Sequence, residues 1–159
     1  MITICSCGQK KSIVENKPRF KVPDSNYVVL SYNKNMDWLF EEGENTNLTE
    51  SELIEIEKIL DIAIEQNNEE QRKRLKQLYP NRNETDFDLQ LKENKRQYIP
   101  IINPKGEKEI WVNFFCREID YIDWKKIPMI ITDGGKCFFN IKVNLTTKTY
   151  SKLYMNSQG

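Results

Sequence analysis

The sequence predicts an α+β fold in which an antiparallel sheet wraps around one long helix. Three observations support this class. A capped amphipathic helix begins near residue 49, a β-rich run precedes it at residues 27–32, and β-rich segments separated by turns fill the chain from residue 97 onward. The 159 residues fit one domain, expected over residues 27–159, because a second core in so short a chain would leave each half marginal.

The first predicted strand covers residues 27–32, which read Tyr-Val-Val-Leu-Ser-Tyr and run into a polar turn. An apolar patch follows at residues 36–40, and we expect it to dock on the body of the domain. Upstream, residues 7–26 contain Pro18 and Pro23 among polar side chains. That composition is typical of a tether.

The strongest local signal is a helix start at Thr49, because Thr49 and Glu52 have the spacing of a capping box ahead of an apolar repeat. We expect this helix to end near Asn67 and Asn68. Apolar residues recur along it every three or four positions and predict one buried stripe: Leu53, Ile56, Leu60, Ala63 and Ile64.

A second, shorter helix is expected at residues 69–79, where Pro80 stops it, and a short strand at residues 87–91. From residue 97 the chain takes on strand character, with turns at residues 103–107 and 133–135. The expected strands of this meander cover residues 97–102, 109–116, 129–132, 136–145 and 149–155.

This order of elements, a strand and a long helix followed by an antiparallel meander, resembles the cystatin-like and NTF2-like roll folds. The resemblance implies that the sheet wraps the apolar stripe of the helix. It concerns architecture only, so it carries no functional residues.

The charge balance and the missing histidine exclude several function classes. The chain has 24 basic and 24 acidic residues, so no overall positive field draws it to nucleic acid, and we expect no nucleic-acid partner. It has no histidine, which removes the usual general base, the commonest metal ligand and every Ser-His or Cys-His catalytic pair. Glycine-rich phosphate-binding motifs are absent too, so we expect no cofactor and no metal site.

The chain starts with a short apolar stub that runs into cysteine and then into polar residues. Residues 4–7 read Ile-Cys-Ser-Cys and resemble the end of a bacterial lipoprotein signal peptide, in which a small residue precedes the acylated cysteine. Ser6 fits that small residue, so the resemblance implies lipidation at Cys7, with residues 1–6 as the rest of a signal peptide and 7–26 as a lipidated tether. Such a signal needs a basic start and a longer apolar stretch, so this interpretation requires a leader upstream of the first methionine. The alternative is a terminal segment with two chance thiols.

Three segments of the C-terminal third, residues 103–109, 111–113 and 133–139, resemble hypothetical lipoproteins that are common in Bacteroidetes. The resemblance implies a cell-envelope protein, on the periplasmic or surface side, held at a membrane by acyl chains on its cysteine. Those relatives have no settled activity, so no site residue follows from them.

Two cysteines remain in the predicted body, Cys116 and Cys137. Strand alternation places both on the core-facing side of their strands. If these strands are adjacent and the thiols lie opposite each other, a disulfide can form, which an envelope compartment permits. The alternative, which the sequence favours, is two buried free thiols that act as small apolar residues.

The opposite side of the same strands alternates aromatic rings with amides and lysines. Rings offer contact area at low entropic cost and amides fix orientation, so this face is typical of a recognition surface. Alternatively, residues 36–40, the second helix or another subunit covers it. The candidate binding residues are Trp111, Asn113, Phe115, Phe138, Asn140, Tyr150 and Tyr154.

These observations predict a non-enzymatic envelope lipoprotein that binds a protein or a small ligand through the aromatic face. No catalytic residue is assigned. One alternative is an inhibitor or immunity-type protein that uses the same surface against a toxin or protease. Another is an acid–base enzyme that uses Asp133, which requires a deep pocket with two or more carboxylates. Asp86 with Asp88 has too few ligands for a calcium site.

Overall fold

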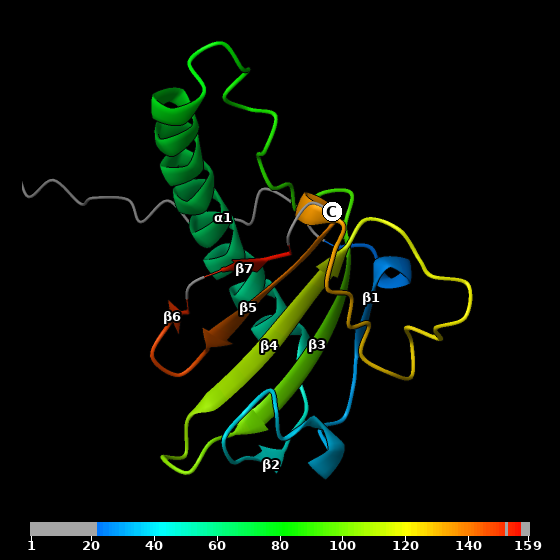
Figure 1. The fold of residues 1–159 in the computed structure, drawn as a ribbon. Coiled ribbons are helices and arrows are strands. Elements are labelled where there is room, and N and C mark those ends of the chain that lie inside the picture. Colours follow the sequence, from blue (N-terminus) through cyan, green and yellow to red (C-terminus); the bar gives the residue numbers. More distant parts are fainter. Residues whose placement is uncertain (1–21, 152, 157–159) are drawn as a thin grey trace, which may run out of the picture.

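The computed structural model describes residues 22–151 and 153–156, and Figure 1 shows one long helix packed against one face of a sheet. The helix, α1, covers Glu50–Leu78. The α+β class is therefore confirmed. The strands are β1 (Tyr27–Val29), β2 (Glu44–Asn45), β3 (Lys95–Ile102), β4 (Lys108–Phe115), β5 (Phe138–Asn144), β6 (Thr149–Tyr150) and β7 (Tyr154–Met155).

The sheet is mixed and has the order β1-β3-β4-β5-β6, with β2 also paired to β3 and β7 also paired to β5. Its pairs are antiparallel except at β1, where Val28 lies opposite Gln97 in a parallel pair. The expectation of a wholly antiparallel sheet is wrong at this edge. The cause is the connection, because the chain leaves β1, passes through α1 and returns in β3 in the same direction, as parallel neighbours require.

Helix α1 begins at the predicted capping box. The Thr49 hydroxyl oxygen accepts a 3.3 Å hydrogen bond from the backbone N–H of Glu52, and the Glu52 carboxylate accepts one of 2.8 Å from the N–H of Thr49. The predicted break near Asn67 and Asn68 is wrong. The helix continues to Leu78 and includes the whole second predicted helix.

Asn68 does not end the helix; its side chain binds an irregular segment of the chain to the helix. Its buried side-chain amide donates a 2.9 Å hydrogen bond to the carbonyl of Leu89 and accepts one of 2.8 Å from the N–H of the same residue. Leu89 and Leu91 are buried in the core beside α1. Residues 87–91 do not form the predicted strand, and the backbone N–H and carbonyl of Leu89 at their centre pair with Asn68 instead of with a neighbouring strand.

The main core lies between α1 and the side of the sheet that we call the helix face. The apolar stripe predicted for the helix meets the alternate inward residues of β4 and β5 there, which confirms the alternation within these two strands. The buried residues are Ile56, Ile59, Leu60, Ala63 and Ile64 from α1, and Tyr98, Ile110, Val112, Phe114, Phe139, Ile141 and Val143 from the sheet.

Three polar side chains join the helix to β3 inside this core. Glu57 accepts a 2.7 Å hydrogen bond from the Tyr98 hydroxyl, and its other carboxylate oxygen lies 3.3 Å from Nη2 of Arg96. Arg96 is fully buried, donates a 3.0 Å bond to the carbonyl of Leu91, and has its guanidinium 5.2 Å from the centre of the Phe114 ring. The helix thus docks through a buried ion pair as well as through apolar contacts.

Two segments that lie far apart in the chain cover the other side of the sheet, which we call the outer face. Residues 36–40 dock there as predicted, in a cluster with Trp111. Residues 117–136, which we call the covering loop, bring Trp124 and Met129 over the end of the sheet. The predicted strand at residues 129–132 does not form, because these residues belong to this loop.

The folded domain begins before residue 27. Val22 is buried, and Asp24–Asn26 form a 3-10 turn that leads into β1. Residues 22–26 therefore belong to the domain rather than to the predicted tether. Among the residues that the structure describes, no helix combines the length and the hydrophobicity of a membrane span.

Candidate functional site

The last two short strands place their tyrosines on opposite faces of the sheet. Val143 lies opposite Tyr150 of β6, and Asn140 lies opposite Tyr154 of β7. Three residue steps along β5 therefore correspond to four steps from Tyr150 to Tyr154. Because of this one-residue difference in register, Tyr150 lies on the helix face, where its hydroxyl hydrogen-bonds Gln66, and Tyr154 lies on the outer face, where it is 69% exposed. The prediction that Tyr150 belongs to the binding face is therefore wrong.

Phe115 is a second predicted binding residue that the structure places elsewhere. It is fully buried, and its ring centre lies 5.3 Å from that of Trp124 in the covering loop. The loop folds back over the end of β4 and takes Phe115 into a small core of its own with Met129 and Phe138. A ligand on the outer face does not reach Phe115.

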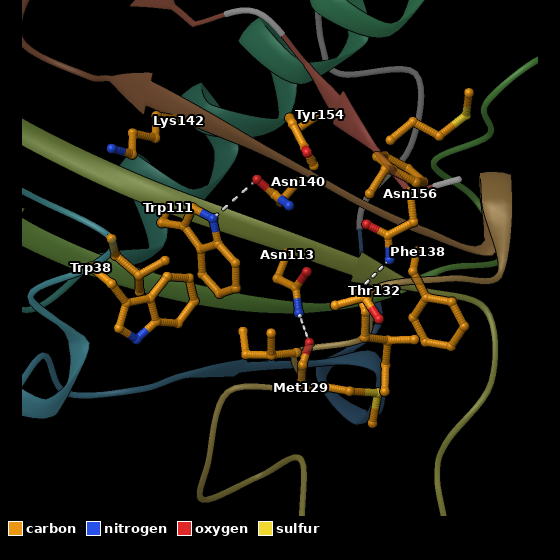
Figure 2. Close-up of a pocket in the computed structure, with 15 residues that line it drawn as sticks. Trp38, Trp111, Asn113, Met129, Thr132, Phe138, Asn140, Lys142, Tyr154 and Asn156 are labelled. Atoms are coloured by element: carbon orange, nitrogen blue, oxygen red, sulfur yellow. Dashed lines mark hydrogen bonds between the residues drawn. The ribbon is translucent and has the colours of Figure 1, made fainter. Parts of the chain in front are cut away.

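Between the two covering segments, the outer face retains an open cavity of about 720 Å³ (Figure 2). Residues 36–40 supply one side through Trp38 and Leu39, and the covering loop supplies another through Met129, Ile130, Ile131 and Thr132. Lys142, Met155 and Asn156 also line it. Five of the seven predicted binding residues contribute to its lining: Trp111, Asn113, Phe138, Asn140 and Tyr154.

The floor of the cavity is held by contacts between neighbouring strands. The indole N–H of Trp111 on β4 donates a 3.2 Å hydrogen bond to the side-chain oxygen of Asn140 on β5. Trp38 packs edge-on against Trp111, with ring centres 6.0 Å apart and planes at 79°. Trp38 is itself 60% exposed, so it stands at the mouth of the cavity with ring surface left for a ligand.

Gln97 of β3 fastens the covering loop to the sheet. Its side-chain amide nitrogen donates hydrogen bonds of 2.5 Å and 2.7 Å to the carbonyls of Trp124 and Ile127. Its oxygen accepts one of 2.7 Å from the N–H of Met129 and one of 3.1 Å from the amide of Asn113. Asn113 also donates a 2.8 Å bond to the Met129 carbonyl. The loop side of the cavity is therefore preformed.

Asn156, just beyond β7, ties the same loop from the other edge of the cavity. Its amide nitrogen donates hydrogen bonds to the carbonyls of Ile131 and Asp133. Because Ile131 and Thr132 line the cavity, this contact joins the C-terminal end of the domain to the loop side of the site.

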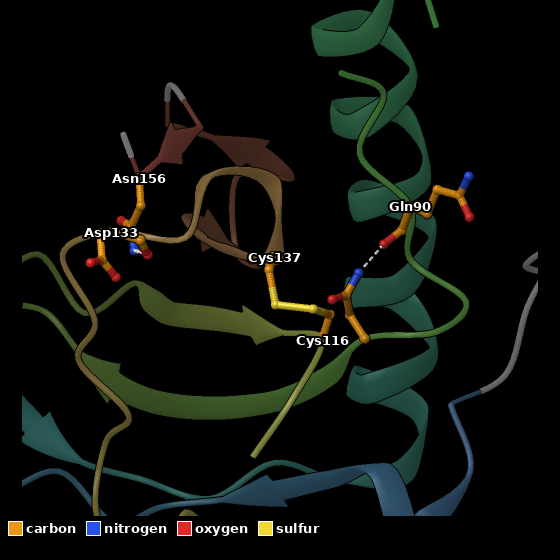
Figure 3. Close-up of a disulfide and its surroundings, with 6 residues drawn as sticks. Gln90, Cys116, Asp133, Cys137 and Asn156 are labelled. Atoms are coloured by element: carbon orange, nitrogen blue, oxygen red, sulfur yellow. Dashed lines mark hydrogen bonds between the residues drawn. A yellow bond between two sulfur atoms is a disulfide. The ribbon is translucent and has the colours of Figure 1, made fainter. Parts of the chain in front are cut away.

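A disulfide between Cys116 and Cys137 closes the covering loop at its base, with the two Cα atoms 5.0 Å apart (Figure 3). The interpretation of these cysteines as free thiols is wrong. Their predicted place in the core is wrong as well, since Cys116 is exposed and Cys137 is half-buried. The reason is that β4 ends at Phe115, where the chain leaves the sheet and its alternation stops.

The predicted carboxylate sites lie outside the cavity. Asp133 is exposed and does not line it, and Asp88 forms an ion pair with Arg72 of α1. The residues that line the cavity include no aspartate or glutamate, so it does not supply the carboxylates that the acid–base alternative requires. Over residues 22–151 and 153–156, no group of three or more His, Cys, Asp or Glu side chains could hold a metal ion.

Several lining residues were not among the predicted binding residues. Lys142 follows Asn140 by two positions on β5, so strand alternation assigns it to the same face. Trp38 and residues 129–132 come from irregular segments, in which no periodic pattern reports the direction of a side chain. Cys7, the predicted lipidation site, lies outside the described residues.

No protein-family model, curated protein or solved structure matches this chain.

Proposed function

We propose that this protein is a non-enzymatic lipoprotein of the cell envelope, anchored to a membrane through Cys7, that binds a small ligand in the cavity on its outer face. The anchor is supported by the resemblance of residues 4–7 to the end of a lipoprotein signal peptide. The binding role is supported by the preformed cavity.

The cavity is the observation that carries the binding role. Its volume of about 720 Å³ falls in the range of about 300–1,000 Å³ that is common for small-molecule sites, and its lining combines apolar side chains with a few convergent polar groups. The hydrogen bonds of Gln97 and Trp111 fix two of its sides. A site that is already ordered costs less conformational entropy when a ligand binds.

A small ligand fits the outer face better than the protein partner of an inhibitor or immunity-type protein. Such a partner needs a broad, accessible surface. Trp111, Phe115 and Phe138 are at most 3% exposed, because the covering segments already pack on them. Trp38 and Tyr154 are well exposed, and both stand beside the cavity.

The disulfide supports the proposed compartment. Cys116 is exposed, so the bond is within reach of soluble thiols. Disulfides persist in oxidising compartments such as the bacterial periplasm and the cell surface, whereas reducing systems keep cytosolic thiols free.

Fluorescence of phenylnaphthylamine, an uncharged aromatic probe that brightens in apolar sites, tests the binding role. We expect saturable binding to the full chain with its disulfide formed. Thr132→Phe, at an exposed residue that lines the cavity, should weaken it by about tenfold or more by filling the space. The matched control is Thr147→Phe, an exposed threonine in the turn between β5 and β6. Equal weakening by both variants, or by neither, contradicts the proposal.

Membrane fractionation tests the anchor. In cells that express the protein with its natural upstream sequence, wild-type chain should sediment with membranes, and Cys7→Ala should move to the soluble fraction because it lacks the acyl chains. Cys5→Ala is the matched control and should stay with the membranes. An unchanged distribution of Cys7→Ala would rule the anchor out.

A further inference from the structure

We infer that the cavity takes an amphipathic anion, meaning a molecule with an apolar or aromatic body and one acidic group such as a carboxylate or a phosphate. This inference rests on the proposed function, because it assumes that the cavity binds a small molecule. It adds the chemical class of that molecule.

The charge of the site comes from a single lysine. Among the described residues that line the cavity, Lys142 alone carries a formal charge. Its ammonium lies 5.1 Å from the centre of the Phe40 ring. In the part of the chain that the structure describes, Lys142 forms no ion pair with a carboxylate. A ligand with an acidic group would supply that partner.

Lys142 differs in this respect from two lysines whose ammonium groups reach α1. Lys108 lies 2.6 Å from the carboxylate of Glu52, and Lys148 lies 3.0 Å from that of Glu55. Both ammonium groups are thus neutralised by carboxylates of α1. The outer face has no such helix above it (Figure 1), and the cavity beside Lys142 is lined by no carboxylate that would repel an anion.

The polar group nearest to Lys142 along β5 is also a donor. Asn140 lies two positions earlier on the same face, and its side-chain oxygen is occupied by the indole N–H of Trp111. Within residues 22–151 and 153–156 no hydrogen bond occupies its amide nitrogen, which is left to a ligand, and Figure 2 shows it directed away from Trp111. An ammonium and an amide N–H on one face suit a group that only accepts hydrogen bonds, which is the character of an ionised acid.

The rest of the lining calls for an apolar body. Apart from Lys142 and a few amide and hydroxyl groups, the walls are aromatic and aliphatic, and the deeper side chains Leu39, Met129 and Phe138 are buried. A strongly hydrated ligand would have to give up its hydration water, and these walls offer no hydrogen bonds to replace it. An apolar body instead removes both its own surface and that of the walls from water. The acidic group would then lie at the rim beside Lys142.

Two fluorescent probes that share an aromatic body and differ by one sulfonate group test this inference on the full chain with its disulfide formed. Anilinonaphthalene sulfonate carries one sulfonate on the same aromatic body as the uncharged phenylnaphthylamine. We expect the anion to bind about fivefold to tenfold more tightly, and we expect salt to weaken the anion alone. Lys142→Met, which keeps the length of the side chain, should remove that preference, while the uncharged probe still binds. Lys148→Met, at the exposed lysine of the last turn, is the matched control.

The outcomes separate this inference from the proposed function. If both probes bind equally to the wild-type chain, or if Lys142→Met weakens both alike, the cavity still binds a ligand and the anionic class is wrong. If neither probe binds, or if Thr132→Phe leaves the binding of both unchanged, the cavity itself is not the site and the proposed function fails as well.

Discussion

The side-chain oxygen of Gln97 accepts a 2.7 Å hydrogen bond from the backbone N–H of Met129, a residue 32 positions further along the chain. Gln97 is fully buried in the middle of the sheet, and Met129 begins the loop side of the cavity. One strand residue therefore holds the covering loop in place. It does so from the side of the sheet that does not touch α1.

Gln97→Met should destabilise the protein by about 2–4 kcal/mol, because it removes four hydrogen bonds and keeps the side-chain volume nearly constant. Urea unfolding followed by circular dichroism measures this change. Gln77→Met, at an exposed glutamine near the end of α1, should stay within about 0.5 kcal/mol of the wild-type value. If the two variants were equally stable, the loop would not depend on Gln97.

The disulfide between Cys116 and Cys137 should contribute about 2–4 kcal/mol, since it closes a loop with a sequence separation of 21 residues. The double variant Cys116→Ala/Cys137→Ala should therefore melt at a lower temperature than the oxidised wild-type protein in a calorimeter. A reducing agent should lower the melting temperature of the wild-type chain toward that of the variant and should leave the variant unchanged. A wild-type melting temperature that does not respond to the reductant would contradict this.

Glu57 should make the protein less stable as the pH rises. Burial raises the pKa of its carboxyl group, and the nearby charge of Asp61 adds to this, while the charge of Arg96 and the hydrogen bond from Tyr98 act in the opposite direction. Because the folded pKa exceeds the unfolded value of about 4.3, the folded state binds more protons between the two values. The stability from Glu57 is thus complete below the unfolded pKa and is lost as the pH rises through the folded pKa.

The variant Glu57→Gln isolates this effect, because glutamine does not titrate and can still accept a hydrogen bond from Tyr98. Urea unfolding of both proteins between about pH 4 and pH 8 should show the wild-type protein losing stability relative to the variant as the pH rises. The other carboxylates titrate in both proteins and cancel in the difference. If the wild-type protein instead gained stability relative to the variant as the pH rose, the pKa of Glu57 would be lowered in the folded state.

The elements that could be predicted from the sequence are those with local causes. Thr49 and Glu52 start the helix through contacts three residues apart, and the hairpin between β3 and β4 follows from strand alternation and a turn at residues 103–107. The outer face could be predicted in part, because alternation alone sends Trp111, Asn113 and Asn140 to one side.

The elements that could not be predicted depend on contacts between distant residues. Asn67 and Asn68 look like a helix end, yet Asn68 finds the backbone of Leu89 and the helix continues. The direction of β1 is set by the path through α1, which no pattern within residues 27–32 reports. The loop side of the cavity depends on Gln97, whose position in a strand gives no sign of the carbonyls that it meets.

The one-residue difference in register between β6 and β7 makes the position of Tyr154 at the cavity depend on the number of residues that separate it from Tyr150. A deletion of one residue between Tyr150 and Tyr154 would remove that difference and still leave the tyrosine opposite Asn140, beside the cavity. An insertion at the same place would move the tyrosine opposite Phe139, into the core. Chains with the same fold should therefore shorten this stretch more readily than they lengthen it, whatever residues they carry there.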